Sequence, residues 1–329
     1  MSSFRLVRDK QGFHIHISPK HFYTIIGVVL SMIAIILGFA GYTFYKANYY
    51  DSSLSVVELR DFNPPSPPPG IAKKIQQIQS PQKKVEGIYD NIHIASISAS
   101  LRVPILMFHY IEYVKNKDDK TRMSLDTNPY AFEQEIRTLK EAGYTFMTNS
   151  ELAEAIDRKK ELPPRPVLLT FDDGYRDFYA DAYPILKKYN AKATQYVIAG
   201  FINRPNHLLL SQLQQIASDG LVEIGAHTVN HVWLKGAPLR TVSNEIFQSR
   251  EILQQMIHKP VVSFAYPFGA FDEQAIKVVK DAGFSSAVAT IPGIDQGQIN
   301  KYFLFRLRPG GRTGQSLINY LNQQKFNNY

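Results

Sequence analysis

A long apolar run near the N-terminus contrasts with the alternating segments in the rest of the chain. Residues 22–45 contain no charged side chain. At about 1.5 Å per residue, a helix of this length spans a bilayer core of about 30 Å. A helix buried in a protein core would carry polar residues along one face, and this run has no such face. The pattern predicts one transmembrane helix.

The charges around this run predict its orientation. Residues 1–21 hold four basic residues and one acidic residue, whereas residues 46–61 hold two basic and three acidic ones. The positive-inside rule therefore places residues 1–21 in the cytoplasm and the chain after the run outside the cell. The run is too long for a cleaved signal peptide and lacks a clear cleavage site, so we expect an uncleaved, single-pass signal anchor in the cell membrane. Residues 46–102, proline-rich at 63–70 and polar from 71 onward, are expected to form an extracellular linker and stalk.

From Val103 onward, apolar runs typical of strands alternate with segments of helical period. Strands are predicted at residues 104–111, 167–171, 193–198, 222–225, 262–266, 286–289 and 303–307. One helix is predicted to start with the cap and N1 proline at Asn128 and Pro129 and to stop at Gly143, with Phe132, Ile136 and Leu139 on its apolar face. Further helices are predicted around residues 180–189, 211–218, 241–257 and 272–282. Such repeated units imply one domain, residues 103–329, built on a parallel sheet that is either open or a barrel.

The residues that carry chemistry favour the barrel. Asp172 and Asp173, His227 and Pro267 each directly follow a predicted strand. The carboxyl ends of the strands in a parallel barrel lie on one face, which is where such folds keep their active sites. Three independent motifs are therefore expected to meet there.

Composition narrows the chemistry and the partners. The chain has no cysteine, which excludes thiolate ligands, so a metal would be held by His, Asp or Glu. The net charge is +8, but residues 1–102 hold 11 Lys and Arg against 6 Asp and Glu, and the remainder holds 26 against 23. The domain is therefore near neutral and lacks a basic stripe, so we expect no nucleic-acid partner.

Two motifs together predict a metal site. His227 and His231, four residues apart, can reach one cation if the segment turns helically, but this spacing also arises by chance and needs a third ligand. Asp172 and Asp173 offer one, because adjacent carboxylates at the end of an apolar strand are costly unless they are paired or bind a cation. One of the two would bind the metal and the other would act as a general base. Gly174 lets the chain turn away without filling the site.

The motifs at residues 170–175 (TFDDGY) and 227–231 (HTVNH) resemble the polysaccharide deacetylase (NodB homology) domain of carbohydrate esterase family 4. The resemblance covers residues 103–322. Within that family, the segments 104–110 and 264–269 are most similar to the biofilm poly-N-acetylglucosamine deacetylases. The resemblance implies a distorted, incomplete (β/α) barrel and a bound zinc ion, or another divalent transition metal.

The resemblance also implies a role for individual residues. Asp172 matches the general base. The metal ligands are matched by Asp173, His227 and His231. Phe268 stands where the family uses a backbone N–H to hold the oxyanion.

The chain departs from the family pattern in two places. The family's arginine that tethers the base is replaced by Ala265, and Arg306 or Arg308 could substitute for it. No histidine follows His258, so the family's late histidine, which protonates the leaving amine, is missing. His109 matches an early-strand histidine that takes this role in biofilm-type members. A histidine on an apolar strand is also often only a hydrogen-bonded core residue, and His258 itself is interpreted as structural.

Several aromatic residues are predicted to contact the substrate. Tyr110, Tyr175 and Trp233 could stack on sugar rings, with core packing as the alternative for Trp233. Arg306 is a further candidate for a substrate contact. His207 carries no partner pattern and is interpreted as structural.

These features predict metal-dependent de-N-acetylation of an extracellular N-acetylglucosamine polysaccharide, either poly-N-acetylglucosamine or a cell-wall glycan, with release of acetate. Two alternatives stay open. One is a glycan-binding pseudo-enzyme, suggested by the missing arginine. The other is a non-haem iron oxygenase, which also uses two histidines and one carboxylate but gives no role to Asp172.

Overall fold

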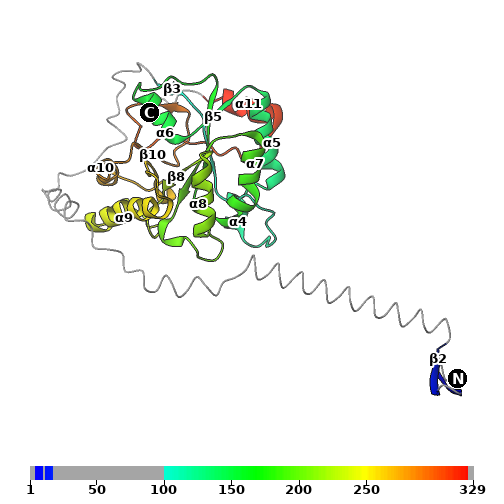
Figure 1. The fold of residues 1–329 in the computed structure, drawn as a ribbon. Helices are drawn as coiled ribbons and strands as arrows, with labels where there is room; N and C mark the ends of the chain where they lie inside the picture. Colours follow the sequence, from blue (N-terminus) through cyan, green and yellow to red (C-terminus); the bar gives the residue numbers. More distant parts are fainter. Residues whose placement is uncertain (1–3, 10–11, 18–99, 325–329) are drawn as a thin grey trace. The chain divides into compact units, whose positions relative to one another are not determined.

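A computed structural model describes residues 4–9, 12–17 and 100–324 (Figure 1). The predicted transmembrane helix at residues 22–45 and the linker up to residue 99 lie outside these ranges. Among the residues that the structure describes, no helix is long and apolar enough to cross a bilayer. In the N-terminal part, β1 (Phe4–Asp9) pairs antiparallel with β2 (Gly12–Ile17).

A seven-stranded parallel sheet forms the centre of the domain. Its order is β10, β9, β8, β7, β6 and β4, and β5 also pairs with β6. The strands are β4 (Ile105–Phe108), β5 (Thr145–Met147), β6 (Pro166–Phe171), β7 (Ala193–Val197), β8 (Val222–Ala226), β9 (Ser263–Ala265) and β10 (Ser286–Val288). Six of the seven predicted strands are therefore confirmed, several of them shorter than expected, and β5 was not predicted.

The sheet curls into a half-barrel that is consistent with a (β/α) barrel (Figure 1). Residues 303–307, predicted as a strand, make only isolated parallel bridges, from Leu304 to Val288 of β10 and from Leu307 to Leu106 of β4. This closing segment therefore lies between the two edge strands of the sheet. Because it pairs with each edge at a single point, it is not a regular strand.

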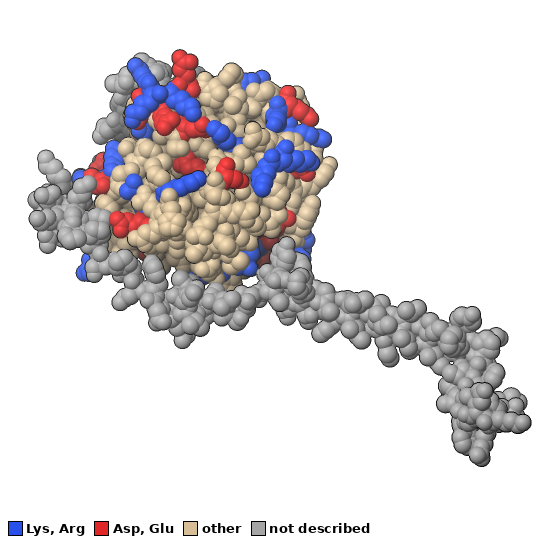
Figure 2. Space-filling model, in the orientation of Figure 1, with Lys and Arg blue, Asp and Glu red and all other residues tan. Residues whose placement is uncertain are grey.

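Helices surround the sheet (Figure 1). They are α4 (Lys120–Leu125), α5 (Pro129–Glu141), α6 (Asn149–Ile156), α7 (Tyr183–Tyr189) after the π-helical turn η1 (Phe178–Ala182), α8 (Leu210–Asp219), α9 (Leu239–Ile257), α10 (Glu273–Asp281) and α11 (Gly314–Asn322). A second small sheet pairs β3 (Leu101–Arg102) antiparallel with β11 (Asp295–Gln296), so the end of the predicted stalk belongs to the folded part. Figure 2 shows acidic and basic side chains interspersed on one face of the domain.

Helix α6 was not predicted from the sequence, although its start carries a recognisable signal. The Thr148 side chain accepts a hydrogen bond from the Glu151 N–H, and the Glu151 carboxylate accepts one from the Thr148 N–H. This reciprocal capping box satisfies two of the N–H groups at the helix start. A Thr with Glu three residues later predicts such a start, so this helix was within reach of sequence reasoning.

The two faces of the sheet bury different residues. Leu169 and Phe171 of β6 belong to the larger apolar cluster that includes helix residues such as Ile136. Leu168, on the other face, packs in a smaller cluster with residues of α6. Successive strand residues alternate between faces, so Asp172, at the end of β6, continues the face of Leu168.

Helix α5 buries a carboxylate beside its apolar residues. Phe132, Ile136 and Leu139 are fully buried, as the sequence predicts, but so is Glu135. Neither carboxylate oxygen of Glu135 makes a well-formed hydrogen bond, although the Gly311 backbone N–H and the charge of Arg312 partly offset its burial. Burial raises the pKa of Glu135 from 4.5 to about 8. Glu135 is therefore protonated at neutral pH in the folded protein.

Replacing Glu135 by Met, of similar volume, is expected to stabilise the protein by about 1–3 kcal/mol, the cost of an unsatisfied buried polar group. The folded state holds a proton that the unfolded state loses above pH 4.5, so wild-type stability falls as pH rises toward about 8. The gain should therefore be larger at about pH 8.5 than at about pH 5, as measured by urea unfolding. Glu141→Met, at an exposed position of the same helix, is the control. A stability gain of Glu135→Met that does not change with pH would contradict a protonated, neutral Glu135 in the folded protein.

Candidate metal centre and active site

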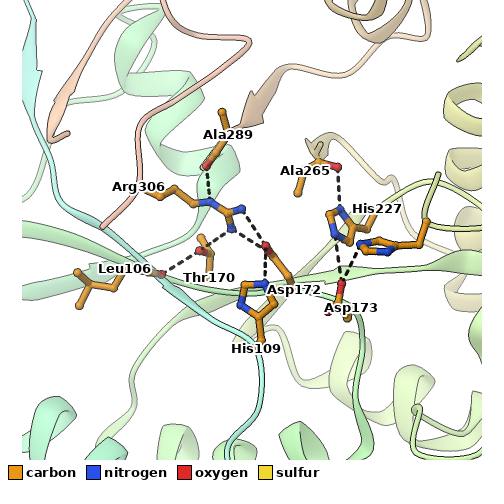
Figure 3. A network of polar contacts seen from close by, with 10 residues as sticks. Leu106, His109, Thr170, Asp172, Asp173, His227, Ala265, Ala289 and Arg306 are labelled. Carbon is orange, nitrogen blue, oxygen red and sulfur yellow. Dashed lines mark hydrogen bonds and ion pairs between the residues drawn. The ribbon is translucent and has the colours of Figure 1, made fainter. Parts of the chain in front are cut away.

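The predicted site residues lie at the carboxyl ends of parallel strands. His109 follows β4, Asp172 and Asp173 follow β6, and His227 follows β8. Phe268 lies in the short 3₁₀ turn η3 (Pro267–Gly269) after β9. Because these strand ends share one edge of the curled sheet, residues far apart in the sequence meet at one place (Figure 3).

Three side chains converge into a group that could hold a metal ion. The ligand atoms of Asp173, His227 and His231 all lie within 4.8 Å of one another. Oδ1 of Asp173 is 3.3 Å from Nε2 of each histidine, yet this buried oxygen makes no hydrogen bond (Figure 3). One carboxylate oxygen and two imidazole nitrogens are donors that suit zinc, and a cation among them would satisfy the orphaned oxygen. The residues therefore fit a divalent transition metal.

Contacts behind the group set the orientation and charge of the imidazoles. Nδ1 of His227 lies 2.8 Å from the carbonyl oxygen of Ala265, which fixes Nδ1 as the donor and leaves Nε2 directed at Asp173. Burial and the neighbouring His227 lower the pKa of His231 to about 4, so this ring is neutral at neutral pH. Ala265, the residue at the expected place of the family arginine, thus contributes its backbone to the site.

The backbone at the site is held in an unusual conformation. Asp173, Thr228, His231 and Phe268 have φ values of 73°, 64°, 55° and 60°. Non-glycine residues in the left-handed region carry strain that persists only where surrounding contacts impose it. Four such residues in one site indicate that the fold imposes the position of these side chains.

Arg306 forms a bidentate ion pair with Asp172. Its Nη1 and Nη2 lie 2.8 Å from Oδ1 and Oδ2 of the carboxylate, and its Nε donates to the Ala289 carbonyl at 2.7 Å (Figure 3). Nη1 also donates to Thr170 Oγ1 at 3.2 Å. Burial alone would raise the pKa of Asp172, but Arg306 holds it below its usual range. Asp172 is therefore an ionised carboxylate at neutral pH.

This geometry changes the interpretation of Arg306. Arg306 was predicted to contact the substrate, but its side chain has no exposed surface and bonds to Asp172, Thr170 and the Ala289 carbonyl. The structure thus gives Arg306 a contact to Asp172, and the substrate contact stays a prediction. Between Arg306 and Arg308, the two candidates for the missing tether, it is Arg306 that holds Asp172, while Arg308 is exposed.

Arg306→Ala is expected to destabilise the protein by about 3–5 kcal/mol, because it leaves the Asp172 carboxylate buried without its counter-charge. Chemical unfolding of the purified protein measures the loss. Arg308→Ala removes the same charge from an exposed position and should change stability by less than about 0.5 kcal/mol. Equal stability of the two variants would show that the pair contributes nothing.

His109 lies beside the same carboxylate. Its Nε2 is 3.9 Å from Oδ2 of Asp172 (Figure 3). The His109 side chain is 14% exposed, so solvent or a substrate can contact it. Burial lowers the pKa of His109 more than the charges of Asp172 and Asp173 raise it. His109 is therefore neutral at neutral pH before any reaction.

Aromatic side chains lie on the surface near these groups. Phe268 lies 4.4 Å from His231 between ring centroids, and Trp233 stacks on Phe268 at 5.9 Å. Trp233 and Phe268 are 58% and 57% exposed, so core packing does not explain Trp233. Tyr110 and Tyr175 stack on each other at 4.0 Å.

The two histidines without a predicted partner have different places. His207 lies 5.1 Å from the ring of Tyr175, so it is close to the aromatic pair although no sequence pattern indicated this. His207 lies in the loop after β7. This loop lies beside the end of β6 because β6 and β7 are neighbouring parallel strands. His258 ends α9 with φ 53° and has a structural position, as expected.

Comparisons with known sequences point to one family. A family model described as polysaccharide deacetylase matches residues 159–287. The chain is 32% identical over 225 residues to a putative polysaccharide deacetylase, YxkH, of Bacillus subtilis. The matched region covers 68% of this chain and 77% of the relative. It is 29% identical over 189 residues to poly-beta-1,6-N-acetyl-D-glucosamine N-deacetylase of Staphylococcus aureus, covering 54% of this chain and 65% of that protein.

Solved structures show the same fold. The deacetylase PplD of Streptococcus pyogenes, solved in complex with acetate, matches 69% of this chain and 100% of its own, with a TM-score of 0.62 and 30% identity. The structure of IcaB from Ammonifex degensii matches 68% of this chain and 97% of its own, with a TM-score of 0.59 and 22% identity. At that identity the second match speaks for the fold alone.

Proposed function

Because the chain belongs to the polysaccharide deacetylase family, we propose that it removes acetyl groups from an extracellular N-acetylglucosamine polysaccharide, either poly-N-acetylglucosamine or a cell-wall glycan. The observation that carries the proposal is the convergence of Asp173, His227 and His231 beside an Asp172 carboxylate that Arg306 keeps ionised. A relative named for poly-beta-1,6-N-acetyl-D-glucosamine and a solved relative in complex with acetate support this substrate and product.

Asp173, His227 and His231 are assigned as ligands of a zinc ion or another divalent transition metal. When bound, such an ion lowers the pKa of water and polarises the acetyl carbonyl as a Lewis acid. The Phe268 backbone N–H is assigned to donate a hydrogen bond to the oxyanion of the tetrahedral intermediate.

Asp172 is assigned as the general base. Its carboxylate is ionised and fixed by two bonds from Arg306, so it can accept a proton from the attacking water without first losing one itself. The positioning matters as much as the charge, because a base must be within hydrogen-bond reach of the proton that it removes. The buried pair supplies that fixed position.

His109 is assigned as the acid that protonates the leaving amine. A neutral imidazole cannot donate until it has gained a proton, and Asp172, 3.9 Å away, receives one in the first step. The proton that leaves the water therefore passes from Asp172 to His109 and then to the nitrogen of the departing glucosamine. The C–N bond breaks, and acetate and a free amine are the products.

The exposed Trp233 and Phe268 and the half-buried Tyr110 and Tyr175 are assigned to the sugar rings. Trp233 and the Phe268 ring lie next to His231 on one side, and the stacked pair of Tyr110 and Tyr175 supplies another set of rings. Aromatic faces suit the apolar faces of sugars, and exposed ones are free to take them.

The structure weakens the support for the two alternative functions, the glycan-binding pseudo-enzyme and the iron oxygenase. The pseudo-enzyme was suggested by the missing arginine, and Arg306 now occupies the tethering role toward Asp172. The oxygenase needs only the metal ligands and leaves the buried pair of Asp172 and Arg306 without a purpose. Hydrolysis gives a role to every one of these groups.

Acetate release from poly-β-1,6-N-acetylglucosamine, peptidoglycan and chitin oligomers tests the function. The protein as purified, the chelator-treated protein and the chelator-treated protein with added zinc are compared on each polymer. Release from one polymer, lost with chelator and restored by zinc, is expected. Binding of glycan without acetate release in any sample would favour the pseudo-enzyme.

We also propose that residues 22–45 anchor the domain outside the cell. The full chain should then stay with membranes after high-salt washing, which strips peripheral proteins. Protease added to intact cells should cut the linker at residues 64–70 and release an active domain, because exposed extended linkers are preferred cutting sites. Release of the domain only after cell breakage would place it in the cytoplasm.

A further inference from the structure

The loop between the two assigned histidine ligands is held on two sides. On one side, the backbone N–H groups of Ala199 and Gly200 donate to the carbonyl oxygens of Thr228 and Val229 at 3.0 and 2.9 Å. A Cβ on Gly200 would lie only 2.6 Å from the Val229 oxygen, so this approach requires glycine. On the other side stands Glu245 of α9.

The Glu245 carboxylate accepts three hydrogen bonds from this loop. Its Oε2 accepts the backbone N–H of Val229 at 2.9 Å and that of Asn230 at 2.8 Å, and its Oε1 accepts the Asn230 side-chain amide at 2.8 Å. Glu245 is only 8% exposed, so these bonds are shielded from water. Hydrogen bonds to an ionised carboxylate are about twice as strong as those between neutral groups.

The loop needs such a restraint because of its backbone. Thr228 and His231 have φ values of 64° and 55°, which non-glycine residues adopt only when contacts impose them. The Thr228 hydroxyl accepts the His231 N–H at 2.9 Å, which ties the loop to itself but to nothing outside it. Glu245 fixes the middle of the loop to a helix of 19 residues.

We propose that Glu245 is a positioning residue of the metal centre. Its carboxylate holds the segment between His227 and His231 so that both imidazoles reach one ion without rearrangement. This inference rests on the proposed role of the two histidines as ligands. Glu245 is not among the side chains that converge on the metal group, and it acts through the Val229 and Asn230 backbone.

The zinc dissociation constant of Glu245 variants tests this role. Glu245→Ala removes all three acceptors and is expected to weaken zinc binding about 10- to 100-fold, as is typical when groups that support metal ligands are removed. Glu245→Gln keeps an uncharged acceptor and is expected to fall between Ala and wild type. Competition with a chromophoric chelator measures the constant on the full chain. At saturating zinc, kcat should recover and KM should stay at the wild-type value.

Glu251→Ala, on the same helix but without a bond to the loop, is the matched control and should bind zinc like wild type. Unchanged zinc affinity in both Glu245 variants, or an equal loss in the control, overturns the inference. If Glu245→Ala does not fold, Glu245→Gln decides by the same criterion. A wild-type chain that binds no zinc overturns the metal centre and this inference together, whereas tight binding in wild type and variants alike overturns only the role of Glu245.

Discussion

Asp172→Asn is expected to reduce acetate release by about 10³- to 10⁴-fold, toward the upper end of what a general base contributes, while zinc content stays at the wild-type level. The amide has nearly the shape of the carboxylate but cannot accept the proton from the attacking water. Because Asp172 is not among the atoms that converge on the metal group, its loss should leave the ligands in place.

Asp173→Asn is the matched comparison for this variant, since it makes the same change one residue later. It removes the charged oxygen that faces both imidazoles and should lower zinc content first, with activity following. Zinc measured by mass spectrometry on the samples used for the acetate assay separates the two effects. Equal loss of zinc in both variants would remove the basis for assigning one aspartate as base and the other as ligand.

His227→Ala is expected to lower zinc affinity by more than about 100-fold and to abolish turnover, because even groups that only support a ligand cost 10–100-fold. His227 is the buried member of the pair, and its loss also frees the Ala265 carbonyl from its partner. Metal content after gel filtration measures the effect. His207→Ala, another histidine of this edge but outside the metal group, should keep its zinc. Full occupancy in the His227 variant would contradict the ligand assignment.

The site residues that could be predicted from the sequence are those that lie close together along the chain. Asp172 and Asp173 end an apolar strand, and His227 and His231 are four residues apart, so each pair is visible in a short window. Six strands of the central sheet and the helices between them were predicted for a similar reason, because apolar periodicity is local, whereas β5, α4, α6 and α11 were not predicted. In the structure these pairs lie together, as expected for residues at the carboxyl ends of parallel strands in one sheet.

The groups that support the site were less predictable, because their partners are distant in the sequence. Arg306 could be named only as one of two tethers, since the segment around it pairs with both edges of the sheet and has no strand pattern of its own. Glu245 looked like any polar residue of an amphipathic helix, and Glu135 likewise. Which of these carboxylates meets an N–H donor and which stays neutral is decided by what packs against the helix.

The closing segment also sets the order in which the site is completed during synthesis. Asp172 leaves the ribosome 134 residues before Arg306, and the loop with His227 and His231 is also made first. Until residue 306 has been made, the Asp172 carboxylate therefore has no counter-charge from Arg306. Arg306 reaches Asp172 only when the segment at residues 303–307 docks between β10 and β4. A chain truncated before residue 303 should therefore lack both the counter-charge of Asp172 and the buried Leu304 and Leu307, so that stability and acetate release should fall together.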